Sequence, residues 1–273
     1  MKPLLSVDGD SFAHRAYHSM PKSVKLNAVV GCTNMMIGLW DQTEPRAVVV
    51  GWDTLEVPTY RHEAFAGYQS GRVFDKSLLE QLDMLPELCG ALRFAVGKAP
   101  GYEADDFLAA AVAYEEGRGG TTIVASGDRD TFQLVSERTT VLQPIRGVSE
   151  IAGIGPAEVR ERYGVEPSQV PDFIALRGDP SDKLPGAKGV GAKTAASLLA
   201  QYDSLEAMLD DGRFSTQADE LRLYKRIASM DAAAPLPELP DAEPDWNGGA
   251  ALVRSWGLNA LADRLEGRAR STS

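Results

Sequence analysis

The chain has 273 residues, of which 44% are apolar and 25% are charged, with 28 basic and 39 acidic side chains. This composition suits one sizeable folded core or two modest ones, and it excludes a disordered, collagen-like or coiled-coil chain. The formal net charge of −11 argues against a simple nucleic-acid coat protein. The sequence has no apolar run of about 18 residues, no leader-like start and only two cysteines, so we expect a cytoplasmic protein without a membrane partner.

Three short apolar segments, each bounded by polar or turn residues, predict buried parallel strands at 4–7, 47–51 and 122–125. Helical periodicity between them, clearest over 78–92 and 107–112, predicts an α/β doubly wound, mostly parallel sheet. Pro86 lies inside the first of these helical segments, which is therefore either a kinked helix or two shorter helices.

The character of the sequence changes after about residue 154, where short helices at 156–163 and 167–176 follow and no further strand is predicted. We therefore expect an α/β domain over 1–153 and a helical region over 154–273. Within that region, the proline-rich and acidic residues 232–245 predict an extended connection, and 250–265 predict a final helix that packs back. The small, polar residues 267–273 predict a flexible tail.

Each predicted strand is followed within a few residues by an aspartate, namely Asp8, Asp53 and Asp128. Ligands of open α/β sheets bind at the carboxyl ends of the strands, so these aspartates are candidate site residues. A fourth group, Glu103 to Asp106, opens a helix. Because residues three apart share a helix face, we expect Glu103 and Asp106 to point the same way and Asp105 to be rotated away, although acids here would equally suit helix capping.

Further acids follow the third strand and lie in a glycine- and proline-rich turn, which completes a set of nine: Asp8, Asp53, Glu103, Asp105, Asp106, Asp128, Asp130, Asp179 and Asp182. Without these nine the formal charge would be −2 instead of −11, so most of the negative charge could lie in one cleft. Carboxylates without cysteine or histidine among them suit Mg²⁺ or Mn²⁺ better than zinc. Two such ions about 3.5 to 4 Å apart could bind a phosphodiester, which makes phosphoryl chemistry the natural candidate.

The segment 184–196 predicts a turn, a Gly-x-Gly pair and the start of a helix. Glycines allow a close approach of the backbone to a phosphate, the amides of a helix start point towards it, and Lys188 and Lys193 add positive charge. Tight turns between helices also use glycine for steric reasons, so this motif gains weight only beside the acidic set.

Six motifs in this order resemble the bacterial and phage 5′-nucleases, a family that comprises flap endonucleases and the 5′ to 3′ exonuclease domain of DNA polymerase I. The motifs are Val7-Asp8-Gly9, Tyr60-Arg61-His62-Glu63, 67–72, 101–106, 127–130 with Gln133-Leu134, and 178–182 followed by 184–194. The resemblance covers nearly the whole chain. It implies a PIN-like nuclease domain over 1–153 with a helical arch around 60–95, and a helix-three-turn-helix DNA-binding region in 154–273.

The resemblance also implies a structure-selective 5′-nuclease that hydrolyses DNA by two-metal-ion catalysis with Mg²⁺ or Mn²⁺, in replication or repair. The first ion would be served by Asp8, Asp53, Glu103, Asp106 and Asp128. The second would be served by Asp128, Asp130, Asp179 and Asp182, with Asp105 nearby. The expected partner is DNA with a free 5′ end, as a flap or an overhang. We expect a monomer without an obligate protein partner and, since the chain ends at residue 273, without a polymerase.

By the same resemblance, Arg15 and Arg72 would steady the scissile phosphate, and Tyr68 would lie near the arch where the terminal base stacks. The duplex phosphates would be held by Lys188, Gly189, Gly191, Lys193 and Thr194, and a potassium ion at the helix-three-turn-helix is a further expectation. Arg61 and His62 would line the base of the arch. For the other histidines, His14 and His18, we expect structural or substrate-side roles, and for Trp52 a place in the core.

The chain departs from the family pattern at three positions. Gln69 replaces the lysine of the arch motif, so a cation that would stabilise transition-state charge is missing. Either Lys76 or another base compensates, or turnover is slower than in relatives, or this branch is tuned to a different substrate. Lys183 replaces an asparagine after Asp182 and could weaken the second ion site. Asp10 adds an acid before an apolar helix, where N-capping is the favoured role.

Two alternatives stay open at this point. Asp128 to Thr131 resemble the motif of haloacid-dehalogenase-type phosphatases, which would make Asp128 a covalent nucleophile, but this leaves Asp8, Asp53 and Glu103 without a role. The second alternative keeps the 5′-nuclease fold as a branched-DNA-binding module with weakened catalysis, because of Gln69 and Lys183.

Overall fold

The computed structural model describes residues 2–146 and 150–271. Its centre is a sheet with the strand order β3-β2-β1-β4-β5-β6, in which all neighbours are parallel except the antiparallel pair β5 and β6. The strands are β1 (Leu4–Asp8), β2 (Ala47–Gly51), β3 (Ala95–Gly97), β4 (Thr122–Ala125), β5 (Thr139–Arg146) and β6 (Glu150–Ile154). The doubly wound α/β fold and the three strands expected from apolar runs are confirmed.

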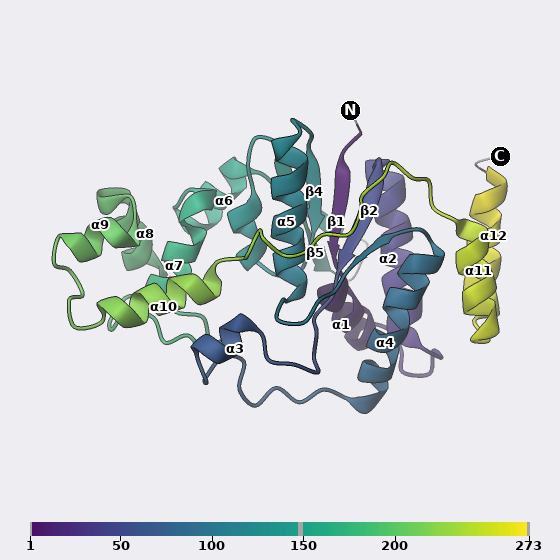
Figure 1. Ribbon diagram of the computed structural model, residues 1–273, viewed down its shortest axis with the longest axis horizontal. Helices are drawn as coiled ribbons and strands as arrows, with labels where there is room; N and C mark the ends of the chain where they lie inside the picture. Colours follow the sequence, from purple (N-terminus) through teal and green to yellow (C-terminus); the bar gives the residue numbers. More distant parts are fainter. Residues whose placement is uncertain (1, 147–149, 272–273) are drawn as a thin grey trace.

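Helices cover both faces of the sheet (Figure 1). On one face, α1 (Gly9–Ser19), α2 (Asn27–Thr43) and α4 (Lys76–Ala91) share a core with Leu5, Val7, Val48 and Val50. On the other face, Ala111 of α5 (Ala104–Gly117) packs against Leu4 and Val49. Apolar strand residues therefore face both layers of helices, as expected for buried parallel strands. Of the two alternatives for Pro86, the structure has a single helix, α4, that continues through this proline.

A helical lobe follows the sheet. It comprises α6 (Pro156–Tyr163), the 3₁₀ turn η2 (Pro167–Gln169), α7 (Val170–Arg177), α8 (Ala192–Tyr202), α9 (Leu205–Asp210) and α10 (Ala218–Ala228). Its core includes Val159, Phe173, Leu199 and Leu221. Within the described residues, no helix of the chain is long and apolar enough to cross a membrane.

The extended connection 232–245 runs from α10 back across the sheet domain to the last two helices (Figure 1). The buried Arg46 anchors it, donating to the carbonyl of Leu239 and to Asp241 while it also binds Glu115 of α5. The final helical stretch packs back as two helices, α11 (Trp246–Ser255) and α12 (Asn259–Ser271), whose apolar residues join the core of α2 and α4. The last two helices therefore pack on the helices of the sheet domain and not on the helical lobe.

The expected flexible tail over 267–273 is wrong as far as residue 271, because α12 extends to Ser271. Arg268 holds this end of the helix: its guanidinium binds Asp41 and lies 5.0 Å from the centre of the Trp246 ring. Residues 272 and 273 lie outside the described part of the chain.

The arch expected around 60–95 consists of the short helix α3 (Tyr60–Ala64), an irregular segment over 65–75, and α4. We call residues 65–75 the crossing segment. The regular helix of the arch is confined to its two flanks, and the crossing segment itself is built from turns.

Candidate metal and nucleic-acid site

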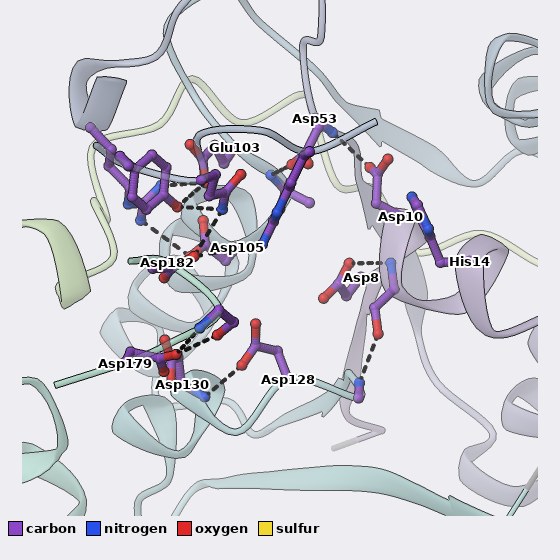
Figure 2. A pocket seen from close by; sticks show the side chains of 18 of the residues that line it. Asp8, Asp10, His14, Asp53, Glu103, Asp105, Asp128, Asp130, Asp179 and Asp182 are labelled. Carbon is purple, nitrogen blue, oxygen red and sulfur yellow. Dashed lines mark hydrogen bonds and ion pairs between the residues drawn. The ribbon is translucent and has the colours of Figure 1, made fainter. Parts of the chain in front are cut away.

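A cavity of about 970 Å³ lies at the carboxyl ends of the strands, between the sheet and the helical lobe. We call it the acidic cavity. Eight of the nine predicted acids line it: Asp8, Asp53, Glu103, Asp105, Asp128, Asp130, Asp179 and Asp182. Figure 2 shows Asp8 and Asp10 on one side of the space and Glu103, Asp179 and Asp182 on the other. Side chains from position 8 to position 182 thus meet at one site, as the sequence predicts.

Asp8 and Asp53 are held by hydrogen bonds to neighbouring elements. Asp8 is the N-cap of α1, where it accepts from the Ser11 amide (2.9 Å), and it also accepts from the Ser126 hydroxyl (2.6 Å) after β4. Asp53 accepts from the amide of Ala104 (2.8 Å). The predicted N-cap role of Asp10 is wrong, because Asp8 occupies that position and the Asp10 carboxylate instead accepts from the Asp53 amide (2.7 Å).

The expected orientation at the start of α5 is also wrong. Asp105 lines the acidic cavity, whereas Asp106 is fully buried outside it. The cause is a capping box, in which the Asp106 side chain turns back to accept from the Glu103 amide (3.0 Å). Asp106 also accepts from the Asp231 amide (2.8 Å), so its carboxylate is engaged away from the cavity.

Arg61 is a buried residue whose importance the sequence did not reveal. It was expected only to line the base of the arch, yet its side chain is surrounded by carboxylates and just 1% of the residue is exposed. Its guanidinium nitrogens lie 3.2 Å from Glu103, 3.1 Å from Asp105 and 2.9 Å from Asp106. The arginine also donates to the carbonyl of Ile227 at the end of α10, so it joins the acidic cavity to the helical lobe. The only signal in the sequence is its place in the Tyr60–Glu63 motif.

Burial and mutual repulsion favour the protonated form of the cavity carboxylates. Burial, together with the charges of Asp53 and Asp128, raises the pKa of Asp8 to about 7, although hydrogen bonds from Ser126 and Ser11 oppose the shift. Burial also raises the pKa of Asp182 to about 6, with additional contributions from Asp128 and Asp179. The pKa of Asp130 is raised well above its usual value by burial first and then by its acidic neighbours. The arginines nearby, Arg72 for Asp182 and Arg177 for Asp130, offset these shifts only in part, and bound cations would stabilise the charged forms of the carboxylates.

The chemistry of these acids suits a hard divalent cation, but their side chains are too far apart at present to surround one. Among the described residues, no three His, Cys, Asp or Glu side chains are close enough together to hold one metal ion. The donor set is nevertheless rich in carboxylate oxygens, and the buried Oδ1 of Asp105 has no hydrogen-bond partner. Binding would thus require side chains to turn towards an ion in the acidic cavity.

The arch residues lie at the cavity as expected, but Tyr68 is not available for stacking in this structure. Its ring is only 4% exposed, packs edge-on against His62 and donates its hydroxyl to Glu103 (2.8 Å). Gln69 and Arg72 also line the cavity, and Arg72 lies 3.6 Å from Asp182. A terminal base would find no free face on the Tyr68 ring.

Several other predicted cations lie away from the cavity lining. Arg15 is packed beside the Gly127 turn and is not part of that lining. Lys76 is exposed and pairs with Glu80, so it does not compensate for Gln69 in this structure, and Lys183 is also outside the lining. The histidines His14 and His18 do line the cavity, in agreement with a structural or substrate-side role. Trp52 is buried in the core as expected.

The Gly-x-Gly motif forms an exposed turn before α8. Gly189 has a positive φ of 77°, a conformation that favours glycine, and Gly191 is the N-cap of α8. A Cβ at either glycine would meet no atom within 4 Å, so the backbone here is open to an approaching group. Lys188, Lys193 and Thr194 are exposed beside it. The arrangement can accept a phosphate.

Comparisons with known proteins agree with this architecture. The chain has a resolvase-like α/β domain with acids at the carboxyl edge of its sheet, followed by a helical domain of the SAM type. Residues 3–164 match the family model of the 5′-3′ exonuclease N-terminal, resolvase-like domain, and 165–245 match that of the 5′-3′ exonuclease C-terminal SAM fold. The chain therefore belongs to the 5′-3′ exonuclease family. This membership leaves the phosphatase alternative without support.

Relatives of similar sequence are DNA polymerases I. That of Mycobacterium tuberculosis is 41% identical over 255 residues, which cover 87% of this chain and 28% of the polymerase. That of Bacillus caldotenax is 34% identical and covers 97% of this chain and 32% of the polymerase. The chain thus spans a third or less of these relatives.

Solved structures of similar fold include a bacteriophage T5 flap endonuclease in a pseudo-enzyme-product complex with DNA and metal ions. It superposes with a TM-score of 0.71 at 16% identity, over 97% of this chain and 98% of the other. The catalytic core of Rad2 in complex with a DNA substrate has a TM-score of 0.61 at 15% identity, over 97% and 91% of the two chains. At these identities the likeness establishes the fold alone.

Proposed function

We propose that this protein is a structure-selective 5′-nuclease that hydrolyses DNA phosphodiesters in replication or repair, as a flap endonuclease, a 5′ to 3′ exonuclease or both. The observation that carries the proposal is the convergence of eight acids in one cavity of a 5′-3′ exonuclease fold. Burial is the main cause that raises the pKa values of six of these acids. The names of the similar proteins, which include a flap endonuclease bound to DNA and metal ions, support it.

The residues proposed to hold two Mg²⁺ or Mn²⁺ ions are those that line the acidic cavity: Asp8, Asp53, Glu103, Asp105, Asp128, Asp130, Asp179 and Asp182. Bound there, the ions would activate water and neutralise charge on the leaving oxygen of a phosphodiester. Asp106 would position Arg61 and the start of α5, so that Glu103 and Asp105 keep their orientation.

The chain's own cations would position the nucleic acid. Arg72 lies at the cavity with its side chain 42% exposed, where it can reach a phosphate as well as Asp182. The exposed turn of Lys188, Gly189, Gly191, Lys193 and Thr194 would bind phosphates of the duplex through backbone amides and lysine charges. A potassium ion at this turn, a monomeric state and the absence of an obligate protein partner belong to the same proposal. So does the division into a nuclease domain and a DNA-binding helical region.

The test is cleavage of 5′-labelled flap, overhang and blunt duplex DNA with Mg²⁺, with Mn²⁺ and without metal. Cleavage of the branched or overhanging substrates with either ion is expected. Asp105→Asn should lose about 100-fold or more of this activity, while the matched control Asp83→Asn, at an exposed position on α4, should keep it. Intact substrates under every condition would reject nuclease activity.

In that event the second candidate, a branched-DNA-binding module with weakened catalysis, would be favoured, because Gln69 leaves the arch without a lysine at the cavity. Binding of flap DNA by the wild-type protein, measured in parallel by gel shift, separates the two candidates. A protein that neither cuts nor binds the flap would contradict both.

A further inference from the structure

The crossing segment is tied to both halves of the acidic cavity by a chain of hydrogen bonds through two of its side chains, Gln69 and Tyr68. The Nε2 of Gln69 donates to Asp182 Oδ1 (3.1 Å) and to the Tyr68 hydroxyl (2.7 Å). The Tyr68 hydroxyl in turn donates to Glu103 Oε2 (2.8 Å). Asp182 belongs to the turn after α7 and Glu103 to the start of α5. The Gln69 amide and the Tyr68 hydroxyl together therefore link a carboxylate of the helical lobe to one of the sheet domain.

The backbone of the crossing segment takes part in the same link. The Gln69 amide points at the Asp182 carbonyl (3.5 Å), and Gln69 has a positive φ of 47°. A non-glycine residue rarely adopts this conformation, and it persists where surrounding contacts determine it. The other contact to this carboxylate, from Arg72 at 3.6 Å, involves a partly exposed side chain and is weakened by solvent. Gln69 therefore makes the shortest contacts between the crossing segment and Asp182.

We propose that Gln69 is a positioning residue that holds the crossing segment over the acidic cavity and, through the same hydrogen bonds, orients Asp182 and Glu103. Both N–H groups of its neutral amide are engaged, so the Gln69 link itself adds no positive charge among the carboxylates. A strand or ion that enters the cavity must accommodate this link. The inference rests on the proposed function only for the identity of the DNA strand or ion that enters the cavity. The position of the crossing segment over the cavity can be tested without any cleavage.

The test is hydrogen exchange, followed by mass spectrometry, on the full chain without metal or DNA. The amides of Tyr68, Ser70 and Arg72 donate to carbonyls within the crossing segment and report on its order. In Gln69→Ala, exchange in the peptide 66–74 should be about tenfold faster, the effect of losing one hydrogen bond to a charged group. Gln69→Glu should be faster still, because a carboxylate has no N–H to donate and repels Asp182.

Two further variants separate positioning from a general loss of structure. Gln69→Lys restores a donor to Asp182 and should return exchange to near the wild-type rate, and Ser70→Ala, at an exposed neighbour, should match wild type. A Ca²⁺ titration by calorimetry should show about tenfold weaker binding in Gln69→Ala and no change in Ser70→Ala, since Gln69 orients two of the carboxylates.

Equal exchange rates of the peptide 66–74 in wild type and Gln69→Ala would overturn the proposal. An equal rise in the exchange rates of the α5 amides would also overturn it, because it would indicate global destabilisation. Unchanged Ca²⁺ affinity would refute the orienting role. These readouts do not depend on catalysis. If wild type cuts no DNA but the exchange and Ca²⁺ results hold, the proposed nuclease activity fails and the role of Gln69 stands.

Discussion

Replacing Arg61 by methionine, which has a similar length and no charge, should strongly destabilise the protein. The substitution leaves Glu103, Asp105 and Asp106 without their common cation, although all three lie within 3.2 Å of it in the wild type. Asp106 is fully buried and has no access to water. Removing one partner from a buried ion pair costs about 3 to 5 kcal/mol. For a chain of this size each kcal/mol lowers Tm by about 2 to 4 °C, so the loss should be about 6 to 20 °C.

The assay is thermal unfolding of Arg61→Met beside Arg226→Met, an exposed arginine on α10 that serves as the matched control. The control should differ from wild type by less than about 0.5 kcal/mol. The deficit of Arg61→Met should shrink at acidic pH, because protonation removes the unpaired charges. Adding Asp106→Asn to Arg61→Met should recover part of the stability, since one orphaned charge is then absent. A cost below about 1 kcal/mol, or a deficit that does not change with pH, would refute the reasoning.

Three further outcomes are expected. Gln69→Lys should cut DNA about tenfold faster than wild type if a missing cation limits the rate, and equal turnover in single-turnover assays would count against that mechanism. Without metal, the stability of wild type should fall by about 2 to 3 kcal/mol from pH 5 to pH 8 relative to Asp8→Asn, because the folded state keeps the Asp8 proton up to about pH 7 while the unfolded chain loses it near pH 4; parallel urea-unfolding curves would contradict this. Finally, changing Lys188 and Lys193 together to glutamine should weaken duplex binding and reduce the slope of log K against log salt by about 2, whereas an unchanged slope would place the phosphates elsewhere.

Local patterns in the sequence were sufficient for the strands that carry the site. The segments of β1, β2 and β4 are short and mainly apolar, and the aspartates at their ends reach the cavity because parallel strands end at the same edge of a sheet. The other strands were not predicted. β3 has only three residues, and β5 and β6 mix polar with apolar residues, so their pairing depends on neighbouring strands more than on their own composition.

The orientation of individual acids depended on contacts that periodicity does not contain. Helical spacing alone predicted that Asp106 shares a face with Glu103, but the capping box draws Asp106 inwards and leaves Asp105 at the cavity. Asp10 likewise received a hydrogen bond from a loop 43 residues away instead of capping its own helix. In both cases the deciding partner is a backbone amide or a cation whose position is set by folding.

The sequence by itself determined the family, three strands of the sheet and the eight acids that line the cavity, because apolar runs, strand-end aspartates and ordered motifs are properties of neighbouring residues. Only the tertiary structure decided that Arg61 sits among three acids, that Gln69 and Tyr68 join the two halves of the cavity, and that α11 and α12 pack on the helices of the sheet domain. These features arise where segments that are distant along the chain pack against one another and bury their side chains away from water. Burial and charge pairing of that kind have no signature in a local pattern.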